Sequence, residues 1–252
     1  MTRRRFYVPR DSIRDGNAHL SSSQAHHLRH VLRLGTGDVV EVFDGEGQGY
    51  LGNVEIQGSQ VTVRALRSLS SEPAPVRIVL APALIKSARF EWILQKATEL
   101  GVYQIVPLAT RLSDIRIPES KLGLRLQRWN RIVIEASKQS RRLVAPRLHE
   151  PIGFSDLLGS GEFSTCTKLL FYEKASNLWS PVDIPGSREI MLCIGPEGGW
   201  ESREVEQAQS SGISVFSLGP WTLRAETAAV AALSILQHRL LIGSRHRSEP
   251  RP

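Results

Sequence analysis

The sequence of 252 residues has few cysteines and no long apolar run. Its two cysteines, Cys166 and Cys193, have no spacing typical of a disulfide or a metal site. No segment approaches the roughly 18 consecutive apolar residues of a membrane span, and the basic amino terminus precedes no apolar core like that of a signal peptide. We therefore expect a cytoplasmic protein that makes no use of membranes, with Cys193 buried in the apolar run around it.

Common nucleotide-binding and nucleophile motifs are also absent. The sequence contains neither the Gly-x-Gly-x-x-Gly fingerprint of dinucleotide-binding folds nor a Gly-x-x-x-x-Gly-Lys-Ser/Thr phosphate loop. No Ser or Cys lies in a nucleophile elbow, so covalent catalysis has no support. His26 and His30 are four residues apart and could bind a metal, but no nearby Cys or Asp offers a third ligand. We expect no metal, and interpret these histidines as surface or RNA-facing side chains.

Acidic residues are scarce in one central segment. Between Arg111 and Arg147 there are ten basic and three acidic side chains, an excess of seven that equals the net charge of +7 of the whole chain. A concentrated basic segment is typical of proteins that bind a phosphate backbone. A solvated helix face on a basic protein is the alternative, but the shortage of compensating acids favours nucleic acid.

The predicted elements change character near residue 73. Before it, short strands at 5–8, 38–43, 49–56 and 61–66 with close glycine turns predict a small β-barrel, interrupted by one helix at 23–33. After it, strands alternate with helices, as in an α/β domain with a parallel sheet. The strands are expected at 77–81, 104–108, 168–172, 189–194 and 214–218, and the helices at 88–100, 124–142, 226–241 and, as a short helix, after Trp200. We predict domains at 1–72 and 73–243, a linker at 68–75 and a disordered basic tail at 244–252.

Two glycine-bearing loops are the most informative part of the chain. Ile194–Trp200 reads IGPEGGW and Leu218–Ala228 reads LGPWTLRAETA, and each follows a predicted strand and precedes a predicted helix. Ligands of open α/β sheets bind at this carboxyl edge, and glycine lets the backbone approach a flat ligand closely. Tight turns without a ligand are the alternative for either loop alone. Together, the loops predict a small-molecule site.

Several segments resemble those of the RsmE-type methyltransferases, which methylate N3 of a uridine in 16S ribosomal RNA of the small subunit. The similar segments run nearly from end to end and comprise Arg4–Val8, His27–Arg33 with Gly37-Asp38, Lys86–Gly101, Glu135–Ser140 and the two loops. The family belongs to the SPOUT class, whose carboxyl-terminal sheet is tied in a deep trefoil knot. The resemblance implies a PUA-like RNA-binding barrel followed by a SPOUT domain, acting as a homodimer on small-subunit ribosomal RNA.

The resemblance also implies a cofactor and its contacts. S-adenosylmethionine would bind in a bent shape, held largely by main-chain groups, and the residues expected to bind it are Tyr172, Gly195, Pro196, Glu197, Gly198, Leu218, Gly219, Leu223, Thr227 and Ala228. The RNA backbone would be bound by basic side chains, which supply affinity but little sequence choice. Those side chains are Arg3, Arg4, Arg5, Arg29, Arg33, Arg111, Arg116, Lys138, Arg141 and Arg142.

Arg224 and Glu226 are the expected catalytic residues. Methylation of uridine N3 requires loss of its proton, which places negative charge on the ring oxygens, and a cation beside them lowers the cost. We expect Arg224 to supply that cation, because arginine stays protonated and cannot act as an ordinary base. The proton would pass to water, to a carboxylate such as Glu226, or to no specific acceptor. Alternatively, Glu226 only stabilises the start of a helix, and Arg224 only contacts a phosphate or a second subunit.

Three residues depart from the family pattern. Arg141 stands where glycine is expected, Trp221 where arginine is expected, and Ala225 where threonine is expected. The last two flank the proposed catalytic residue Arg224. Three rival functions remain open at this point: a methyltransferase acting on transfer RNA, a non-catalytic RNA-binding or ribosome-assembly protein, and a nucleotide-dependent metabolic enzyme.

Overall fold

The computed structural model describes residues 3–69, 76–180 and 187–248, with the side chains of 241–248 left out. The chain forms two compact units, and each is described by itself. The first consists of Met1–Pro73 and Ile134–Ala145, and the second of Ala74–Val133 and Pro146–Pro252. The sequence-based division at residue 72 therefore differs from the structure in the segment 134–145.

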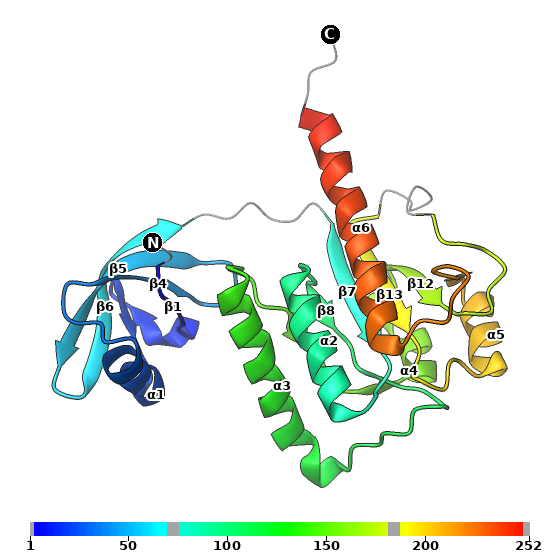
Figure 1. Ribbon diagram of the computed structural model, residues 1–252, viewed down its shortest axis with the longest axis horizontal. Helices are drawn as coiled ribbons and strands as arrows, with labels where there is room; N and C mark the ends of the chain where they lie inside the picture. The colour runs from blue at the N-terminus through cyan, green and yellow to red at the C-terminus, as the bar shows by residue number, and fades with distance from the viewer. Residues whose placement is uncertain (1–2, 70–75, 181–186, 249–252) are drawn as a thin grey trace. The chain divides into compact units, whose positions relative to one another are not determined.

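The first unit is a six-stranded mixed sheet with a short helix against it. The strands pair in the order β1-β4-β5-β6-β3-β2, and Figure 1 shows the sheet curving beside α1. Their bounds are β1 Arg5–Tyr7, β2 Ile13–Arg14, β3 Asn17–His19, β4 Val39–Phe43, β5 Gly49–Gln57 and β6 Gln60–Leu69. The helix α1 (Ser22–His26) continues as a π-helical turn, His27–Val31, and its Ala25 and Leu28 pack into the core of the sheet.

The segment 134–145 belongs to the first unit because its contacts lie there. Val144 bridges to Gly45 and Glu46, and the Leu143 side chain packs so closely on Gly49 that a Cβ at that position would lie 2.5 Å from it. No larger residue fits at position 49 without displacing Leu143. The sequence pattern of a single long helix gave no sign of this contact, because it depends on residues nearly a hundred positions apart.

The second unit is a parallel α/β sheet. Six strands pair in the order β10-β8-β7-β13-β12-β14, and every pairing is parallel. The strands are β7 Arg77–Pro82, β8 Gln104–Ile105, β10 Arg147–Leu148, β12 Thr167–Phe171, β13 Glu189–Ile194 and β14 Ser214–Phe216, with β9 Leu108–Ala109 and β11 Ile152–Gly153 forming a separate pair. The helices are α2 Ser87–Glu99, α3 Glu119–Gln139, α4 Phe154–Gly159, α5 Ser202–Ser210 and α6 Ala225–Ser248, and residues 134–139 of α3 belong to the first unit.

Helices cover both faces of this parallel sheet (Figure 1). On one face, Val79, Met191 and Cys193 pack with Phe154 of α4 and Val205 of α5. On the other, α6 lies against β7 and β13 and beside α2. Strands covered on both faces need continuous apolar runs rather than alternating ones, which explains why β13 reads EIMLCI with five buried residues.

The central strands end at the same level. Phe171 at the end of β12 pairs with Ile194 at the end of β13 and with Phe216 at the end of β14. Because these strands are parallel neighbours, the segments that follow them emerge side by side at one edge of the sheet. The fold thereby brings together three loops that are separated by about 20 residues or more in the sequence.

The predicted α/β class with a parallel sheet is confirmed, and the trefoil knot stays a prediction. The sequence missed the strands β2, β3, β10 and β11 and the helix α4, which are all six residues or shorter. It also placed the end of the last helix too early, because α6 continues to Ser248. The predicted tail is therefore wrong for residues 244–248, whereas residues 249–252 and the predicted linker residues 70–75 lie outside the described residues. Within the described part of the chain, no helix is long and apolar enough to span a membrane.

Candidate active site

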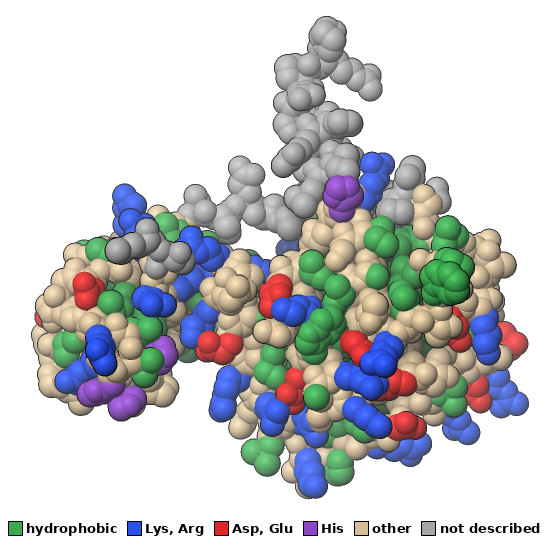
Figure 2. Space-filling model, viewed as in Figure 1, with side chains coloured by type: hydrophobic (Ala, Val, Ile, Leu, Met, Phe, Trp, Pro, Cys, Tyr) green, Lys and Arg blue, Asp and Glu red, His purple; other side chains and the backbone are tan. Residues whose placement is uncertain are grey.

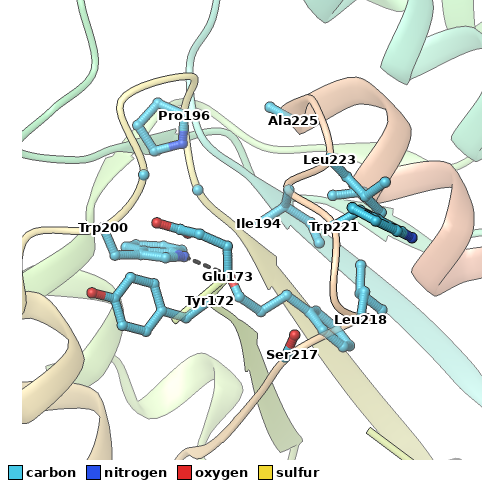
Figure 3. A pocket seen from close by; sticks show the side chains of 14 residues that line it. Tyr172, Glu173, Ile194, Pro196, Trp200, Ser217, Leu218, Trp221, Leu223 and Ala225 are labelled. Atoms are coloured by element: carbon cyan, nitrogen blue, oxygen red, sulfur yellow. Dashed lines mark hydrogen bonds between the residues drawn. The ribbon is translucent and has the colours of Figure 1, made fainter. Parts of the chain in front are cut away.

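A hollow lies where β12, β13 and β14 end. Figure 3 shows the side chains that surround it, which come from all three strand ends and from the start of α6. The residues that line it are Phe171, Tyr172, Glu173, Ile194, Gly195, Pro196, Gly199, Trp200, Ser217, Leu218, Trp221, Leu223, Ala225 and Ala228.

The loop between β13 and α5 is shaped by Trp200. The indole is buried, and its Nε1–H donates a hydrogen bond of 2.9 Å to the carbonyl of Phe171 at the end of β12. A Cβ at Gly195 would lie 2.9 Å from that Nε1 atom. Gly199 has a φ of +74°, a left-handed conformation that favours glycine. Two of the three glycines thus have a structural reason that the sequence alone could not distinguish from a ligand contact.

The loop between β14 and α6 leaves main-chain groups available. Ser217 fixes its first turn, since its hydroxyl donates to the carbonyl of Gly219 at 2.9 Å and accepts from the Gly219 amide at 3.2 Å. The main-chain N–H and C=O groups of Leu218 and Leu223 make no hydrogen bond to another described residue. Both residues line the hollow. Main-chain donors and acceptors without partners beside an apolar wall suit the edge of a flat heterocycle.

Glu173 is the only titratable carboxylate among the lining residues, and it reaches toward the opposite loop. A Cβ placed on Gly199 would lie 3.2 Å from its Oε1 atom. In Figure 3 the Glu173 side chain extends past the Trp200 indole toward the loop that carries Pro196. An otherwise apolar wall with one carboxylate fits a ligand that combines a flat apolar ring with a positive charge.

The structure brings most of the predicted cofactor residues together, but not all. Tyr172, Gly195, Pro196, Leu218, Leu223 and Ala228 line the hollow. Glu197, Gly198 and Gly219 lie on the same loops, and Thr227 lies in the first turn of α6, but none of the four lines the hollow. Gly198 instead lies against Leu112, to which a Cβ would approach within 3.2 Å. Among the additional lining residues, Phe171 and Ser217 lie at strand ends that carry no recognisable motif, whereas Ile194 and Ala225 belong to the two glycine-bearing segments.

Arg89, in the first turn of α2, links the two loops and was missed by the sequence analysis. Its Nη1 atom lies 3.2 Å from Glu197 Oε1, and its Nε atom lies 3.7 Å from Glu226 Oε1. The Glu226 side chain is 15% exposed, and its Oε2 atom is buried without a hydrogen-bond partner among the described residues. A cation in the first turn of a helix opposes the helix dipole. That unfavourable position was the one sequence signal that Arg89 has acidic partners.

Arg224 is differently placed from Glu226. It precedes α6 directly, is exposed, and makes no ion pair with another described residue. Glu226 does not line the hollow and is held by Arg89. Of the two predicted catalytic residues, Arg224 is therefore available to a ligand, whereas the carboxylate of Glu226 already pairs with Arg89.

The guanidinium of Arg5, one of the predicted RNA contacts, is used inside the first unit, and its contact with RNA stays a prediction. The side chain is only 5% exposed, and its Nε atom lies 2.7 Å from Glu41 Oε1. It donates hydrogen bonds to the carbonyls of Ser137 at 3.1 Å and Arg142 at 2.7 Å, and it stacks 4.1 Å from the centre of the Phe43 ring. Burial is the largest of the effects that lower the pKa of Arg5.

The remaining predicted RNA-binding side chains differ in how accessible their charge is. Burial lowers the pKa of Arg142 to about 10, Lys138 pairs with Glu135 at 2.9 Å, and Arg29 donates to the carbonyl of Gly58. The exposed members are Arg3, Arg4, Arg33, Arg111, Arg116 and Arg141.

A second groove lies within the second unit and is lined by several arginines. Arg111 and Arg116 line it together with Arg203 of α5, and none of the three forms an ion pair with another described residue. Glu204 holds the groove together, because its Oε1 accepts from the Arg111 amide at 2.9 Å and its Oε2 from the Glu201 amide at 3.1 Å. The sequence analysis found the first two arginines by charge density and missed Arg203, which is distant in sequence.

The three departures from the family pattern occupy distinct environments. Arg141 has a φ of +61°, which explains why glycine would be favoured there. Trp221 is exposed at the rim of the hollow, whereas Ala225 is buried in its wall.

No group of three or more His, Cys, Asp and Glu side chains that could hold a metal occurs among the described residues. The rings of His26 and His30 lie 4.5 Å apart on the exposed side of the first unit's helical segment.

Comparison with known proteins shows a consistent similarity. Residues 72–237 match the model of an RNA methyltransferase domain, and residues 20–66 match that of an RNA methyltransferase PUA domain. The chain is 32% identical over 234 residues to ribosomal RNA small subunit methyltransferase E of Synechocystis, covering 91% of this chain and 76% of that protein. It is 31% identical to the protein of the same name from Rickettsia conorii, covering 94% of this chain and 95% of that protein.

Solved structures show the same similarity. A Neisseria gonorrhoeae ribosomal RNA small subunit methyltransferase E bound to S-adenosylmethionine matches with a TM-score of 0.84 at 29% identity, covering 94% of this chain and 98% of that chain. A Legionella pneumophila protein with bound S-adenosylmethionine matches with a TM-score of 0.84 at 32% identity, covering 95% and 98%.

Proposed function

Because the chain belongs to the RNA methyltransferase family, whose domain model spans residues 72–237, we propose that it transfers the methyl group of S-adenosylmethionine to N3 of a uridine in 16S ribosomal RNA of the small subunit. The observation that carries this proposal is the hollow at the aligned ends of β12, β13 and β14. It is formed by the same two loops whose motifs are the most specific in the sequence. The relatives named as small-subunit ribosomal RNA methyltransferases support the choice of substrate, and such a substrate implies a cytoplasmic location.

The residues around the hollow fit S-adenosylmethionine. The free main-chain groups of Leu218 and Leu223 would pair with the adenine edge, and the apolar side chains beside them would cover its faces. The Glu173 carboxylate would lie near the positive charge of the amino group or the sulfonium. When bound, S-adenosylmethionine supplies a methyl group attached to a positively charged sulfur. Glu197, Gly198, Gly219 and Thr227 do not line the hollow, so their contact with the cofactor stays a prediction.

Arg224 would act on the uracil ring. Forming the bond from N3 to the methyl carbon breaks the bond from that carbon to sulfur and releases the N3 proton. The guanidinium beside the ring oxygens would stabilise the negative charge that develops on them. For the proton we retain solvent water and Glu226 as acceptors.

The RNA would follow the exposed arginines. Arg111, Arg116 and Arg203 line one groove of the second unit, and Arg3, Arg4, Arg33 and Arg141 are exposed on the first. Such contacts supply affinity and salt dependence rather than sequence choice. The change Arg33→Ala should therefore weaken RNA binding more than saturated turnover, and a large loss of turnover with unchanged affinity would contradict this role.

A homodimer would cover the apolar side chains that α2 and α6 leave exposed. Trp92 of α2 is 40% exposed and Ile235 of α6 is 39% exposed, and the two helices pack side by side. Figure 2 shows hydrophobic side chains gathered over this part of the second unit. A monomer at micromolar concentration in analytical ultracentrifugation would contradict the dimer.

The direct test is transfer of radiolabelled methyl from S-adenosylmethionine to small ribosomal subunits that lack the family's modification. Free ribosomal RNA and transfer RNA serve as alternative acceptors, and the variants are Arg224→Ala and Arg224→Lys. We expect label at uridine N3, a loss of about 100-fold or more in saturated turnover for Arg224→Ala, and partial activity for Arg224→Lys. Label in transfer RNA alone, or no label together with no S-adenosylmethionine binding by calorimetry, would refute the proposal.

A further inference from the structure

Trp221 is exposed to an extent that is unusual for its size. Its side chain is 81% exposed, whereas Trp129, Trp179 and Trp200 are each at most 8% exposed and Trp92 is 40% exposed. A large aromatic side chain left in water gives up the stabilisation that burial provides. Exposed aromatic rings at a pocket rim are typical of binding surfaces.

The ring stands at the mouth of the hollow rather than on an unrelated surface. Trp221 lies between Leu218 and Leu223 on the β14–α6 loop, and it lines the hollow although most of its surface faces outward. Figure 3 shows it beside Leu223, on the side of the hollow opposite Tyr172 and Trp200. A flat group resting on the exposed face of this ring would therefore lie next to any ligand in the hollow.

The neighbouring charge identifies the chemistry of that group. Arg224 follows three residues later, is exposed, and has no ion pair with another described residue. An exposed aromatic ring three residues from an exposed guanidinium without an ion pair matches an unstacked nucleotide, because the ring can stack on the base and the cation can pair with the phosphate or the base oxygens. A protein partner covering the ring would have to bring an acid to Arg224, whereas RNA supplies both complements.

We propose that Trp221 is a stacking platform for a nucleobase of the RNA substrate at the mouth of the cofactor hollow. The proposal rests on the proposed function and adds a residue that acts on RNA placement rather than on the methyl donor. It also assigns a use to one of the departures from the family pattern, since a planar ring replaces the planar guanidinium expected at this position.

The test compares Trp221→Phe with Trp221→Leu. Phenylalanine keeps a ring that can stack, whereas leucine keeps apolar surface without one. Leu124→Ala, which removes an exposed apolar side chain of α3, is the matched control. For each variant we would measure the KM for small subunits and kcat, co-sedimentation with those subunits, the Kd for S-adenosylmethionine and the sedimentation coefficient.

We expect Trp221→Leu to raise the KM and weaken co-sedimentation by about 5- to 150-fold, the loss expected for one stacked base. Trp221→Phe and Leu124→Ala should stay within about threefold of the wild type, and no variant should change S-adenosylmethionine affinity or the sedimentation coefficient. Weakened cofactor binding would mean that the ring covers the cofactor, and a changed sedimentation coefficient that a second chain covers it. Either result overturns the proposal. Equal KM and co-sedimentation of the variants Trp221→Phe and Trp221→Leu would overturn it as well.

The two proposals fail separately. If the wild type transfers no methyl group to any RNA, the proposed function fails, and the stacking platform is then decided by co-sedimentation alone. If the wild type methylates small subunits and Trp221→Leu binds them as well as the wild type does, only the stacking platform fails.

Discussion

Replacing Arg5 should destabilise the first unit rather than remove an RNA contact. In Arg5→Ala, the Glu41 carboxylate, whose side chain is only 13% exposed, would lose its ion-pair partner, and the carbonyls of Ser137 and Arg142 would each lose one donor. Removing one partner of a buried ion pair typically costs about 3–5 kcal/mol. We expect the lower end, about 3 kcal/mol, because water still reaches part of the Glu41 carboxylate.

Urea unfolding followed by two signals measures this loss. All five tryptophans lie in the second unit, so tryptophan fluorescence reports on that unit, whereas far-UV circular dichroism reports on both. We expect the circular dichroism transition of Arg5→Ala to move to lower urea. The exposed neighbour Arg4 provides the control, and Arg4→Ala should change stability by no more than about 0.5 kcal/mol.

A double replacement separates structure from RNA binding. In Arg5→Met with Glu41→Leu, no buried charge is left unpaired, so most of the lost stability should return. Affinity for small ribosomal subunits should then match that of the wild type. Equal stability of Arg5→Ala and Arg4→Ala, or a stable double variant with much weaker RNA binding, would show that Arg5 serves RNA and that the reasoning is incorrect.

Three further predictions follow from single positions. Gly195→Ala should weaken S-adenosylmethionine binding by about tenfold or more in calorimetry, because its Cβ would lie 2.9 Å from Trp200 Nε1; Gly159→Ala, whose Cβ meets open space, should leave affinity unchanged. Burial lowers the pKa of His149 below its usual value of about 6.5, so the unfolded chain binds the extra proton and stability should fall as pH drops from about 6.5. The change His149→Gln should flatten that slope in unfolding experiments between about pH 5 and 7, and an unchanged slope would contradict the assignment. Arg141→Gly should raise stability by up to about 1 kcal/mol in thermal unfolding because φ is +61°, whereas a loss of stability would contradict strain at this position.

Local patterns were sufficient to predict the long elements and the two loops. The helix α2 has Phe90, Ile93, Leu94 and Ala97 on one buried stripe, a spacing that follows directly from 3.6 residues per turn. The strand β13 could be predicted from its continuous apolar run, which it has because both of its faces are covered. The glycine loops are recognisable because their residue types tolerate backbone conformations that few others do.

The sequence alone could not predict the short strands or which of two neighbouring arginines is buried. The strands β2 and β3 have two and three residues, too few for a period of two to be visible. Arg4 and Arg5 are adjacent arginines, yet only the Arg5 side chain is buried, whereas that of Arg4 is exposed. Nothing in the residue type distinguishes them, because the difference depends on where Glu41 and the end of α3 lie in the first unit.

The sequence by itself determined that the chain is an α/β protein with excess positive charge and two glycine loops at strand ends, since these depend on composition and short-range periodicity. Only the tertiary structure decided which residues share a site. Parallel pairing aligns Phe171, Ile194 and Phe216, and the ion pairs of Arg89 join Glu197 to Glu226. Such contacts join residues far apart in the chain, and they depend on the register of strands and the packing of helices, which no local pattern encodes.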